Sequence, residues 1–350
     1  METLHLSWNE WKKAADFLKR GEIVAFPTET VFGLGAIASS EEAFARLAEL
    51  KKRPPEKPFS LMCSSIGEAV RYAEIDYRSR AVLQKFFPGE VTVLLTPRKD
   101  VPHHITLGSP FIGIRIPASE QVRSLIEAVG GALLVPSANL SGEPAATKAE
   151  EVASVFDGKI AAIIDGECQD GQASTIVSCA NGKIALVREG PVPFCQIQEA
   201  FDTTECTVAL GSDHGGLDYK NAIKEHLLAR GFHVLDQGTM DSSSCDYPVF
   251  AKLAARAVAD GRAEKGILVC TSGEGIMMAA NKVPSIRCGI GYDDRVSAKC
   301  VEHNNANMIS FGQSYMALED VLRRVDIFLC ETFSPNPRHH RRVEEIESEK

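Results

Sequence analysis

A regular alternation of short apolar runs with helical patterns in residues 206–331 is the feature that most constrains this chain. The apolar runs fit buried strands, and the amphipathic stretches between them fit helices. The alternation predicts strands at 206–211, 232–235, 266–270, 286–291 and 307–311, and helices near 217–230, 248–260, 275–281, 294–303 and 315–331. Strands joined by such helices form a parallel, doubly wound, Rossmann-like sheet whose site lies at the carboxyl ends of the strands.

The residues before this region predict a domain of another kind. Apolar segments and helical patterns mix less regularly there, which is typical of a mixed α/β domain. The expected β segments are EIVAFPTET, FSLMC, VTVLLTP, GIRIP, ALLVPSAN, AAIIDG and TIVSC, and the expected helices cover 8–20, 40–52, 78–87 and 119–129. A polar stretch places the junction near residues 196–206, so we expect domains at 1–200 and 206–350.

Composition narrows the classes of partner. The 47 acidic and 38 basic residues give a net charge of −9, so no overall positive field draws the chain onto nucleic acid or an anionic membrane. No apolar run approaches the ~18 residues that span a bilayer, and the first residues lack the apolar core of a secretory signal. The ten cysteines form no C-x-x-C pair and no zinc-type spacing with histidine, so we expect reduced thiols, a cytoplasmic location and no metal site.

Four polar clusters follow predicted strands or helices of the first domain. They are Pro27-Thr28-Glu29-Thr30, Lys51-Lys52-Arg53 with Lys57, Pro136-Ser137-Ala138-Asn139, and Ser174-Thr175. Together they predict a polar cleft assembled from loops, in which the paired prolines of KKRPPEK stiffen a cluster of cations that could hold a polyphosphate. The alternative is a solvated helix end, because cations are favoured at helix carboxyl termini without any ligand.

These clusters, in this order, make residues 5–195 resemble the YrdC family of L-threonylcarbamoyladenylate synthases. The matching stretches are FPTETVFGLG, LKKRPPEKPFSLM, FPGEVTVLL, IGIRIPA, VPSANLSGEP, DGQASTIV and VREGPV. The resemblance implies a twisted α/β domain that joins L-threonine, bicarbonate and ATP into threonylcarbamoyl-AMP and releases pyrophosphate. The product would serve N6-threonylcarbamoyladenosine formation in tRNA, with Mg²⁺ expected beside ATP and tRNA or tRNA-modification proteins as further partners.

The resemblance also implies roles for individual residues of the first domain. Lys51, Arg53 and Lys57 match phosphate-facing cations, which can offset developing charge during adenylyl transfer. The nucleotide contacts would be Ser137, Asn139 and Arg188, and the threonine contacts Thr30, Arg115 and Ser174. Arg115 suits a carboxylate because its guanidinium can form two parallel hydrogen bonds.

Two polar loops follow predicted strands of the second domain. Gly211-Ser212-Asp213-His214-Gly215-Gly216 brings a carboxylate and an imidazole to a strand end, where a substrate hydroxyl can be bound. Cys270-Thr271-Ser272-Gly273-Glu274-Gly275 opens a helix whose free amide groups can hold an oxyanion. The alternatives are a glycine turn required by packing and a cysteine that only fills the core.

Residues 206–345 resemble the RpiB/LacAB family of sugar-phosphate isomerases through GSDHGG, DYKNAIKEHL, DYPVFA, GILVC, AANKVPSIR, EHNNANMI and RHHRRV. The resemblance implies aldose–ketose isomerisation through an enediol without a cofactor, ribose 5-phosphate being the expected substrate. Cys270 falls at the position of the base, with Ile276 where some members have glutamate, and His303 falls at the position of the proton donor for ring opening. The substrate contacts would be Asp213, His214, Thr271, Ser272, Gly273, Gly275, Asn304, Arg338, His339 and Arg342. Glu274 is expected to be exposed, and family members form dimers that share sites, so we expect a homodimer through this half.

One departure from the isomerase pattern leaves alternatives open. Gly312-Gln313-Ser314 stands where the family usually has arginine at the third position, so one phosphate cation is absent unless Arg338, Arg342 or a neighbour such as Arg295 replaces it. The second domain could therefore act on another sugar phosphate, of the galactose- or allose-6-phosphate type, or serve as a dimerisation scaffold. The first domain could be an RNA-binding module that uses its cations for backbone phosphates.

Overall fold

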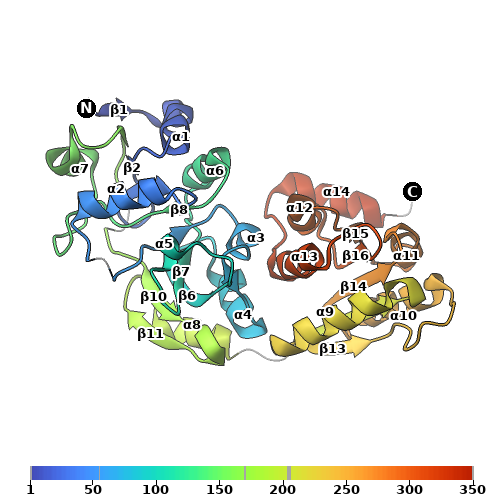
Figure 1. Ribbon diagram of the computed structural model, residues 1–350. Coiled ribbons are helices and arrows are strands. Elements are labelled where there is room, and N and C mark those ends of the chain that lie inside the picture. The colour runs from blue at the N-terminus through green and yellow to red at the C-terminus, as the bar shows by residue number, and fades with distance from the viewer. Residues whose placement is uncertain (1, 55, 169–170, 203–205, 349–350) are drawn as a thin grey trace. The chain divides into compact units, whose positions relative to one another are not determined.

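The computed structural model describes residues 2–54, 56–168, 171–202 and 206–348. The chain forms two compact units, one of residues 1–74 and 81–202 and one of residues 75–80 and 203–350 (Figure 1). Helix α8 (Phe194–Phe201) occupies part of the stretch in which a polar junction was expected, because Ile197, Ala200 and Phe201 supply it with an apolar face. Residues 203–205 of that expected junction lie outside the described residues.

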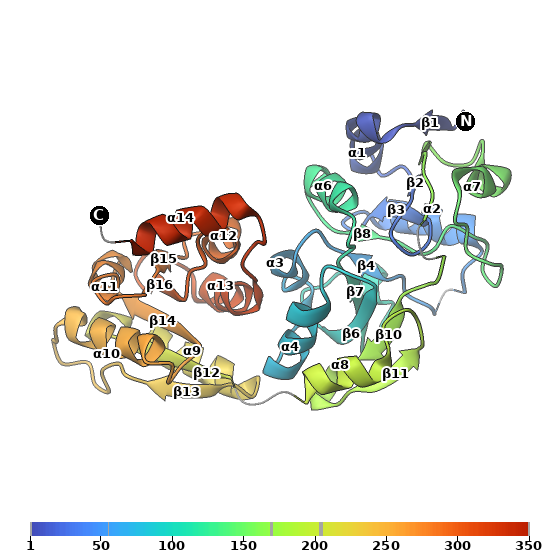
Figure 2. The same cartoon turned by 180° about the vertical axis from the view of Figure 1, so that it is seen from behind.

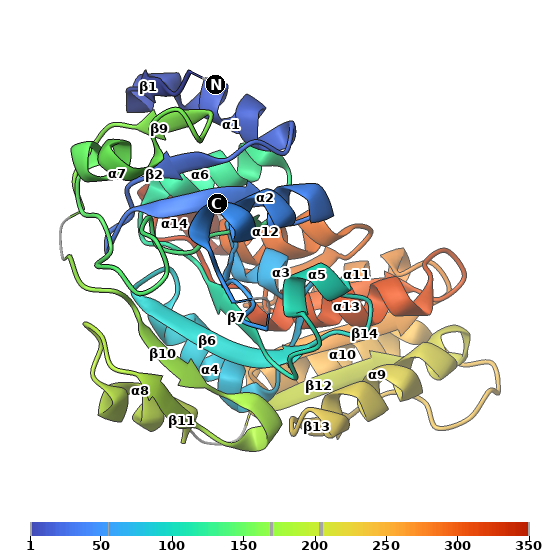
Figure 3. The same ribbon diagram turned by 60° about the vertical axis from the view of Figure 1, so that its left-hand side comes forward.

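The first unit is built on a mixed sheet, which confirms the predicted α/β class. Among the described residues its strands run in the order β1-β9-β2-β3-β8-β4-β7-β6-β10-β11, and β5 pairs with β6. Their bounds are Leu4–Leu6, Ala162–Ile164, Val24–Phe26, Gly33–Ile37, Leu133–Leu134, Leu61–Met62, Ile112–Arg115, Val91–Pro97, Thr175–Ser178, Ala185–Arg188 and, for β5, Ala73–Glu74. Strands β6 and β10 are parallel and lie side by side, with β11 antiparallel beyond them (Figure 3). This arrangement brings the starts of β6 and β10 together.

Helices α1 (Trp11–Lys19) and α6 (Glu120–Val129) pack together in the first unit, as Figure 2 shows from behind. Ala14 and Leu18 of α1 share one apolar cluster with Val122 and Ile126 of α6 and with Phe26 of the sheet. The other helices of this unit are α2 (Glu41–Lys51), α3 (Ile66–Ala69), α5 (His103–Thr106) and α7 (Ala149–Phe156). Helix α4 (Tyr77–Phe86) is divided between the two units, its residues from 81 on belonging to the first.

Strand β3 was not predicted as a separate strand, and its glycines explain why. A Cβ atom on Gly35 would lie 2.6 Å from the ring of Phe26, and one on Gly33 would lie 2.5 Å from Val135. Large side chains from neighbouring strands therefore fill the space that β3 leaves, so this strand must lack the branched residues by which strands are usually found.

The second unit has a five-stranded, wholly parallel sheet, as predicted. Its order is β13-β12-β14-β16-β15, with bounds His233–Asp236, Thr207–Ser212, Lys265–Cys270, Met308–Gly312 and Cys288–Ile290. Because all these strands point the same way, their carboxyl ends form one edge of the sheet and their amino ends form the opposite edge.

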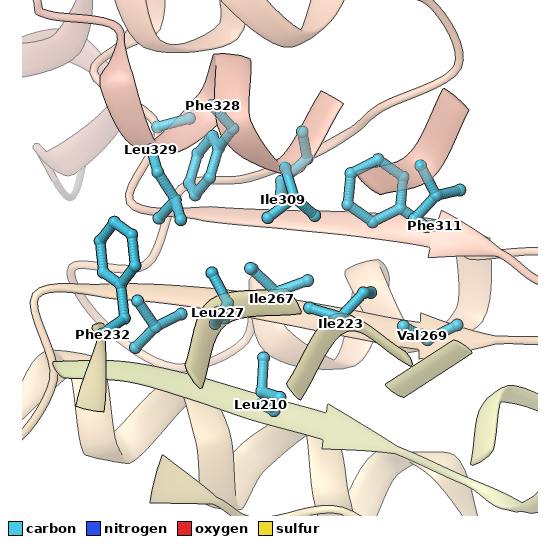
Figure 4. Packing of buried hydrophobic residues seen from close by; sticks show 14 of the residues in the cluster. Leu210, Ile223, Leu227, Phe232, Ile267, Val269, Ile309, Phe311, Phe328 and Leu329 are labelled. Carbon is cyan, nitrogen blue, oxygen red and sulfur yellow. The ribbon is translucent and has the colours of Figure 1, made fainter. Parts of the chain in front are cut away.

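Helices cover both faces of this sheet, which makes the unit doubly wound. Helices α10 (Tyr247–Ala259) and α11 (Glu274–Ala280) pack on one face through small residues such as Ala251 and Ala254. Helices α9 (Leu217–Ala229), α12 (Asp294–Asn304) and α13 (Leu318–Cys330) belong to the other face. There Leu227 and Phe328 meet Ile267 and Ile309 of the strands (Figure 4).

The carboxyl-terminal segment forms a helix beyond the last one predicted from the sequence. Residues Pro337–Glu347 form helix α14, whose first turn is capped by the side chain of Asn336 accepting from the backbone N–H of Arg338. The side chain of His339 is buried, and α14 contacts α12. Packing against α12 therefore holds the start of this helix in place.

Candidate active sites

A tight turn after β2 positions the first polar cluster. The hydroxyl of Thr28 donates to the carbonyl oxygen of Val31 at 2.7 Å and lies 3.1 Å from the hydroxyl of Thr30. Both threonines are buried. These contacts fix the backbone on either side of Glu29, so its carboxylate is directed toward one partner.

That partner is Arg115, at the end of β7. Its Nη2 donates to Oε1 of Glu29 at 2.6 Å, and its Nε donates to the carbonyl oxygen of Gly89 at 3.3 Å. The two paired side chains are only 9% and 11% exposed. Oε2 of Glu29 is buried and has no hydrogen-bond partner among the described residues. The pair thus combines a guanidinium with a carboxylate oxygen that accepts no hydrogen bond, and both side chains are largely buried.

Ser174, directly before β10, and Arg188, the last residue of β11, extend this cluster. The hydroxyl of Ser174 lies 2.8 Å from that of Thr92 on β6, and Nη2 of Arg188 donates to the carbonyl oxygen of Ser174 at 2.7 Å. Burial, and then the charge of Arg115, lower the pKa of Arg188, so the two guanidinium groups lie near one another. Two close cations beside buried hydroxyl groups can bind an anion.

Cys168 is a neighbour that no sequence pattern indicated. Its thiol pKa is raised to about 11 by burial, and the backbone of Thr28 and the charges of Glu29 and Arg115 also act on it. The thiol therefore stays protonated and serves as a small lining group rather than a nucleophile.

Lys51 holds together a second polar cluster of the first unit, which contains Ser137 and Asn139. Its ammonium, at the end of α2, donates to the carbonyl oxygens of Ser137 and Asn139, the latter at 2.7 Å, and to Oδ1 of Asn139 at 3.2 Å. The hydroxyl of Ser137 donates to the same Oδ1 at 2.6 Å. Burial, and then the charge of Arg53, lower the pKa of Lys51 to about 8.

The loop of Ser137 also lies beside the strand that follows the threonine turn. Gly33 bridges to Ser137, and the N–H of Ala138 donates to the carbonyl oxygen of Phe32 at 2.7 Å. The two groups are therefore connected through β3. They bring together seven of the predicted residues, namely Thr30, Lys51, Arg115, Ser137, Asn139, Ser174 and Arg188.

Arg53 and Lys57 stand at the entrance loop. Nε of Arg53 donates to the carbonyl oxygen of Lys57 at 2.8 Å, and its guanidinium lies 4.6 Å from the ring centroid of Phe59. Burial lowers the pKa of Arg53. The side chain of Lys57 is exposed, and Lys57 meets Arg53 through its backbone carbonyl oxygen.

The carboxyl-terminal edge of the second sheet carries the predicted cysteine. Cys270, the last residue of β14, is buried, and its sulfur accepts the N–H of Gly273 at 3.1 Å. Gly273 has a positive φ of 85°, and a Cβ atom there would lie 2.9 Å from the backbone of Phe311. Only glycine therefore allows the loop to fold back over the sulfur. Glu274 is exposed, as expected.

Asp213 lies at the same edge, after β12. A Cβ atom on Gly215 would lie 2.3 Å from the hydroxyl of Thr271 and 3.5 Å from Oδ1 of Asp213, so the two loops touch. Asp213 is buried, and its Oδ1 has no hydrogen-bond partner among the described residues. A buried carboxylate oxygen without a donor is suited to receive a hydroxyl group of a ligand.

Two residues of this edge were not predicted as site residues. The N–H of Cys245 donates to Nδ1 of His214 at 3.2 Å, which leaves the proton of a neutral ring on Nε2. A Cβ atom on Gly275 would lie 2.8 Å from the ring of Tyr247, so this half-exposed tyrosine covers the glycine loop. The stretch DYPVFA contained Tyr247, but its spacing alone gave no reason to place it here.

A buried ion pair between Lys220 and Asp236 stabilises the segments at this edge. The ammonium of Lys220 on α9 donates to both oxygens of Asp236 at 3.0 Å and to the carbonyl oxygen of Thr239 at 2.7 Å. The N–H of Thr239 in turn donates to the carbonyl oxygen of Ser212 at 2.9 Å. Lys220 therefore ties the segment after β13 to the strand end that carries Asp213.

His303 lies elsewhere, near the end of α12. Its ring stacks on that of His339 with centroids 4.3 Å apart and planes 11° apart. Burial lowers the pKa of both rings, with a further lowering of the His339 value by Arg338 and Arg342. His339 is buried, so it supports His303 rather than facing solvent, while Asn304, Arg338 and Arg342 are exposed.

The polarity of the strands places His303 and its neighbours away from Cys270. Strand β16 pairs with β14 from Met308 opposite Gly266 to Gly312 opposite Cys270, four steps that span roughly 13 Å. Helix α12 runs back from the carboxyl-terminal edge and ends before β16 begins, so His303 lies at the amino-terminal edge. Within one chain, Cys270 and His303 do not share a site.

The chain thus consists of two α/β units, each with polar loops that could bind anions. Residues 16–190 match the Sua5/YciO/YrdC family, described as telomere recombination, and residues 208–346 match the LacAB/RpiB family, described as ribose/galactose isomerase. The chain belongs to both families, one in each unit.

Individual relatives agree with this division. A threonylcarbamoyl-AMP synthase of Pyrococcus abyssi is 40% identical over 194 residues, which cover 54% of this chain and 57% of the relative, so only about half of that relative is spanned. Ribose-5-phosphate isomerase B of Escherichia coli is 40% identical over 142 residues, which cover 40% of this chain and 93% of the relative. A solved variant of the P. abyssi Sua5 protein superposes with a TM-score of 0.55 at 25% identity, covering 93% of this chain and 87% of that chain.

Two further properties follow from the described residues. Within those ranges, no helix is both long and apolar enough to cross a membrane, and no group of three or more His, Cys, Asp or Glu residues could hold a metal ion. The ten cysteines form no disulfide within the described residues.

Lys220→Met is expected to destabilise the second unit by about 3–5 kcal/mol, because it leaves Asp236 buried without its main partner. Hydrogen exchange of β12 and β14 amides in the full chain measures this loss. Lys224→Met is the matched control on the same helix: Lys224 also contacts Asp236, at 3.2 Å, but is 38% exposed, so at most about 1 kcal/mol is expected. Equal effects of the two variants would contradict the assigned role of Lys220.

Proposed function

We propose that the first unit joins L-threonine, bicarbonate and ATP into threonylcarbamoyl-AMP and releases pyrophosphate. One observation carries the proposal. The cluster of Arg115 and Ser174, which combines a guanidinium with hydroxyl groups, is connected through β3 to the loop of Ser137 and Asn139. The cluster of Arg115 and Ser174 is suited to an amino-acid carboxylate, and the loop of Ser137 and Asn139 is suited to a nucleotide. The relatives named as threonylcarbamoyl-AMP synthases support the same assignment.

Each residue group has a separate task in this proposal. The fork of Arg115 binds the threonine carboxylate, and the hydroxyls of Thr30 and Ser174 contact the rest of that substrate. Ser137, Asn139 and Arg188 contact the nucleotide. Lys51 and Arg53, with Lys57 at the entrance, offset the negative charge that develops on the leaving pyrophosphate. ATP arrives as its Mg²⁺ complex, the metal being held by the phosphates, since the described residues form no carboxylate cluster for it.

We propose that the second unit interconverts ribose 5-phosphate and ribulose 5-phosphate through an enediol. The sulfur of Cys270 moves a proton between C1 and C2, and the amide groups of residues 271–275, Ser272 among them, hold the enediolate oxygens. Oδ1 of Asp213 accepts a substrate hydroxyl, and Nε2–H of His214 donates to a substrate oxygen. No cofactor takes part in these steps. The relative named ribose-5-phosphate isomerase B supports this assignment.

The second site is complete only when two copies of the chain meet. His303 and Asn304 would serve ring opening, and Arg338 and Arg342 would bind the phosphate, yet all four lie at the sheet edge away from Cys270. We propose a homodimer in which the amino-terminal edge of one subunit covers the carboxyl-terminal edge of its partner. The ten free thiols fit a reducing compartment such as the cytoplasm.

The substrate of the second unit has one further candidate. At Ser314 the backbone N–H donates to the carbonyl oxygen of Thr271, and the side-chain oxygen of Gln313 accepts the N–H of Tyr219 at 3.0 Å. Neither side chain supplies the cation that the family usually has at this place. Arg295, in the first turn of α12, lies at the same edge as Cys270. A galactose- or allose-type 6-phosphate is therefore the second candidate.

Pyrophosphate release from ATP by the full chain is expected only when threonine and bicarbonate are both present. Arg115→Lys should raise the KM for threonine roughly 10- to 100-fold, because lysine cannot form the two parallel hydrogen bonds of the guanidinium. Arg20→Lys, at an exposed arginine paired with Glu22, is the matched control and should leave the KM unchanged. Absence of pyrophosphate release together with tight RNA binding would instead make the unit an RNA-binding module.

ATP binding is expected to weaken as the pH rises through the pKa of about 8 of Lys51. Above that pH the ammonium loses its proton and no longer opposes the phosphate charge, so the Kd should increase about tenfold between pH 7 and pH 9. Calorimetry with Lys51→Arg, which stays charged, should give a flat profile, and Lys51→Met should bind weakly at both pH values. An unchanged wild-type Kd would contradict a role for Lys51 in phosphate binding.

Cys270→Ala and His303→Ala are each expected to abolish ribulose 5-phosphate formation, and a co-expressed mixture of the two should recover about a quarter of wild-type activity. Random pairing makes half of the dimers mixed, and each mixed dimer has one intact site of two. A Cys270→Ala/His303→Ala double variant mixed with either single variant should recover nothing. Two inactive variants that stay inactive when mixed would contradict the shared site, and an inactive wild type would direct the assay to the 6-phosphates and then to a scaffold role.

A further inference from the structure

We propose that Glu29 is a catalytic residue of the first unit, which takes the proton from the α-ammonium group of the amino-acid substrate. The inference rests on the function proposed above for this unit and adds a step to it. An ammonium group has no lone pair, so it cannot form the N–C bond of a carbamate until a base has removed one proton. The arginines and the hydroxyl groups assigned to the threonine site cannot do this.

The first argument is the unequal state of the two carboxylate oxygens. Oε1 of Glu29 accepts from Nη2 of Arg115 at 2.6 Å, whereas Oε2 is buried without a hydrogen-bond partner among the described residues. Leaving an ionised oxygen buried and unpaired is costly, and native structures rarely do so without a functional reason. A substrate ammonium group, or the proton it gives up, would satisfy this oxygen.

The second argument is the position of that oxygen relative to the carboxylate site. Nη2 of Arg115 is paired with Glu29 and Nε with the carbonyl oxygen of Gly89, while Nη1 has no partner among the residues that the structure describes. A substrate carboxylate bound at Nη1 carries its amine on the adjacent carbon. The amine is then held beside the guanidinium, on which the carboxylate of Glu29 already sits.

The third argument is that the neighbouring groups cannot accept a proton. The charged and titratable groups that face Glu29 are Arg115 from β7, Cys168 from the segment after β9 and, through Arg115, Arg188 from β11. Both arginines are cations. Burial raises the pKa of Cys168 to about 11, so its thiol is already protonated. Glu29 is the base of this cluster.

The proposed step balances without any further reactant. Glu29 takes one proton from R–NH₃⁺ and leaves R–NH₂. The nitrogen lone pair then attacks the carbon of bicarbonate, an N–C bond forms, a C–O bond breaks, and water leaves with one nitrogen proton to give R–NH–COO⁻. A carbamate oxygen next attacks the α-phosphorus of ATP, and the bond to pyrophosphate breaks. Glu29 returns its proton to solvent after the product leaves.

The test compares pyrophosphate release by the full chain and its Glu29→Gln variant, with threonine, bicarbonate and ATP, between pH 7 and pH 9. The amide keeps an oxygen for Arg115 but cannot take a proton. At pH 7 kcat should fall at least about 100-fold while the KM for threonine changes less than about threefold. The variant's rate should then rise about tenfold per pH unit as more threonine carries a neutral amine, more steeply than the wild-type rate.

Two further variants make the result decisive. Glu29→Asp, which keeps a shorter base, should recover part of the rate at pH 7, and Glu22→Gln, which removes a carboxylate paired with Arg20 outside the site, should match the wild type. Equal pH profiles of Glu29→Gln and the wild type would overturn the proposal. So would a pH-independent loss accompanied by loss of threonine binding, which would indicate a purely structural role. A wild type that releases no pyrophosphate would overturn the proposed function itself, and with it this step.

Discussion

The polarity of the parallel strands is the constraint on which the second unit depends. Every residue that follows a strand reaches one edge of the sheet, and every residue that precedes a strand reaches the other. Asp213 and Cys270 are of the first kind, whereas His303 is of the second, and helix α14 joins it there through the stacked ring of His339. No adjustment of loops can cancel a separation of several residues along rigid strands. The isomerase site that we propose draws on both edges, which is why the proposal includes a second copy of the chain.

Buried charges support the site residues in both units. Lys220 and Lys51 each direct three hydrogen bonds to acceptors in or beside the polar loops, and Lys51 keeps its positive charge close to the Ser137–Asn139 loop. Arg115 differs, because its partner Glu29 retains an unsatisfied oxygen. A fully satisfied buried pair rigidifies its surroundings, whereas a partly satisfied one stores an unmet interaction that a ligand can complete.

The sequence allowed most elements of the second unit to be predicted, because alternation of apolar runs and helical patterns is a local signal. Strand β3 and helix α14 were missed, since Gly33 and Gly35 are dictated by neighbouring side chains and His339 is buried by contact with α12. The residue types of both sites were also predictable from short motifs. Their division between two sheet edges, and the roles of Lys220 and Cys168, were not, because they depend on strand order and packing between distant segments.

The two units differ in how far their candidate anion-binding cations are removed from water. The chain has a net charge of −9, so at long range it repels the anionic substrates proposed for both sites. In the first unit the cations Lys51 and Arg115 are buried, so dissolved salt weakens their attraction for an anion only slightly. The second unit has Arg338 and Arg342 in solvent, where screening is strong, and gains low-dielectric surroundings for them only if a partner subunit covers that edge. Dimerisation would therefore supply the second unit with both the missing residues and the missing burial.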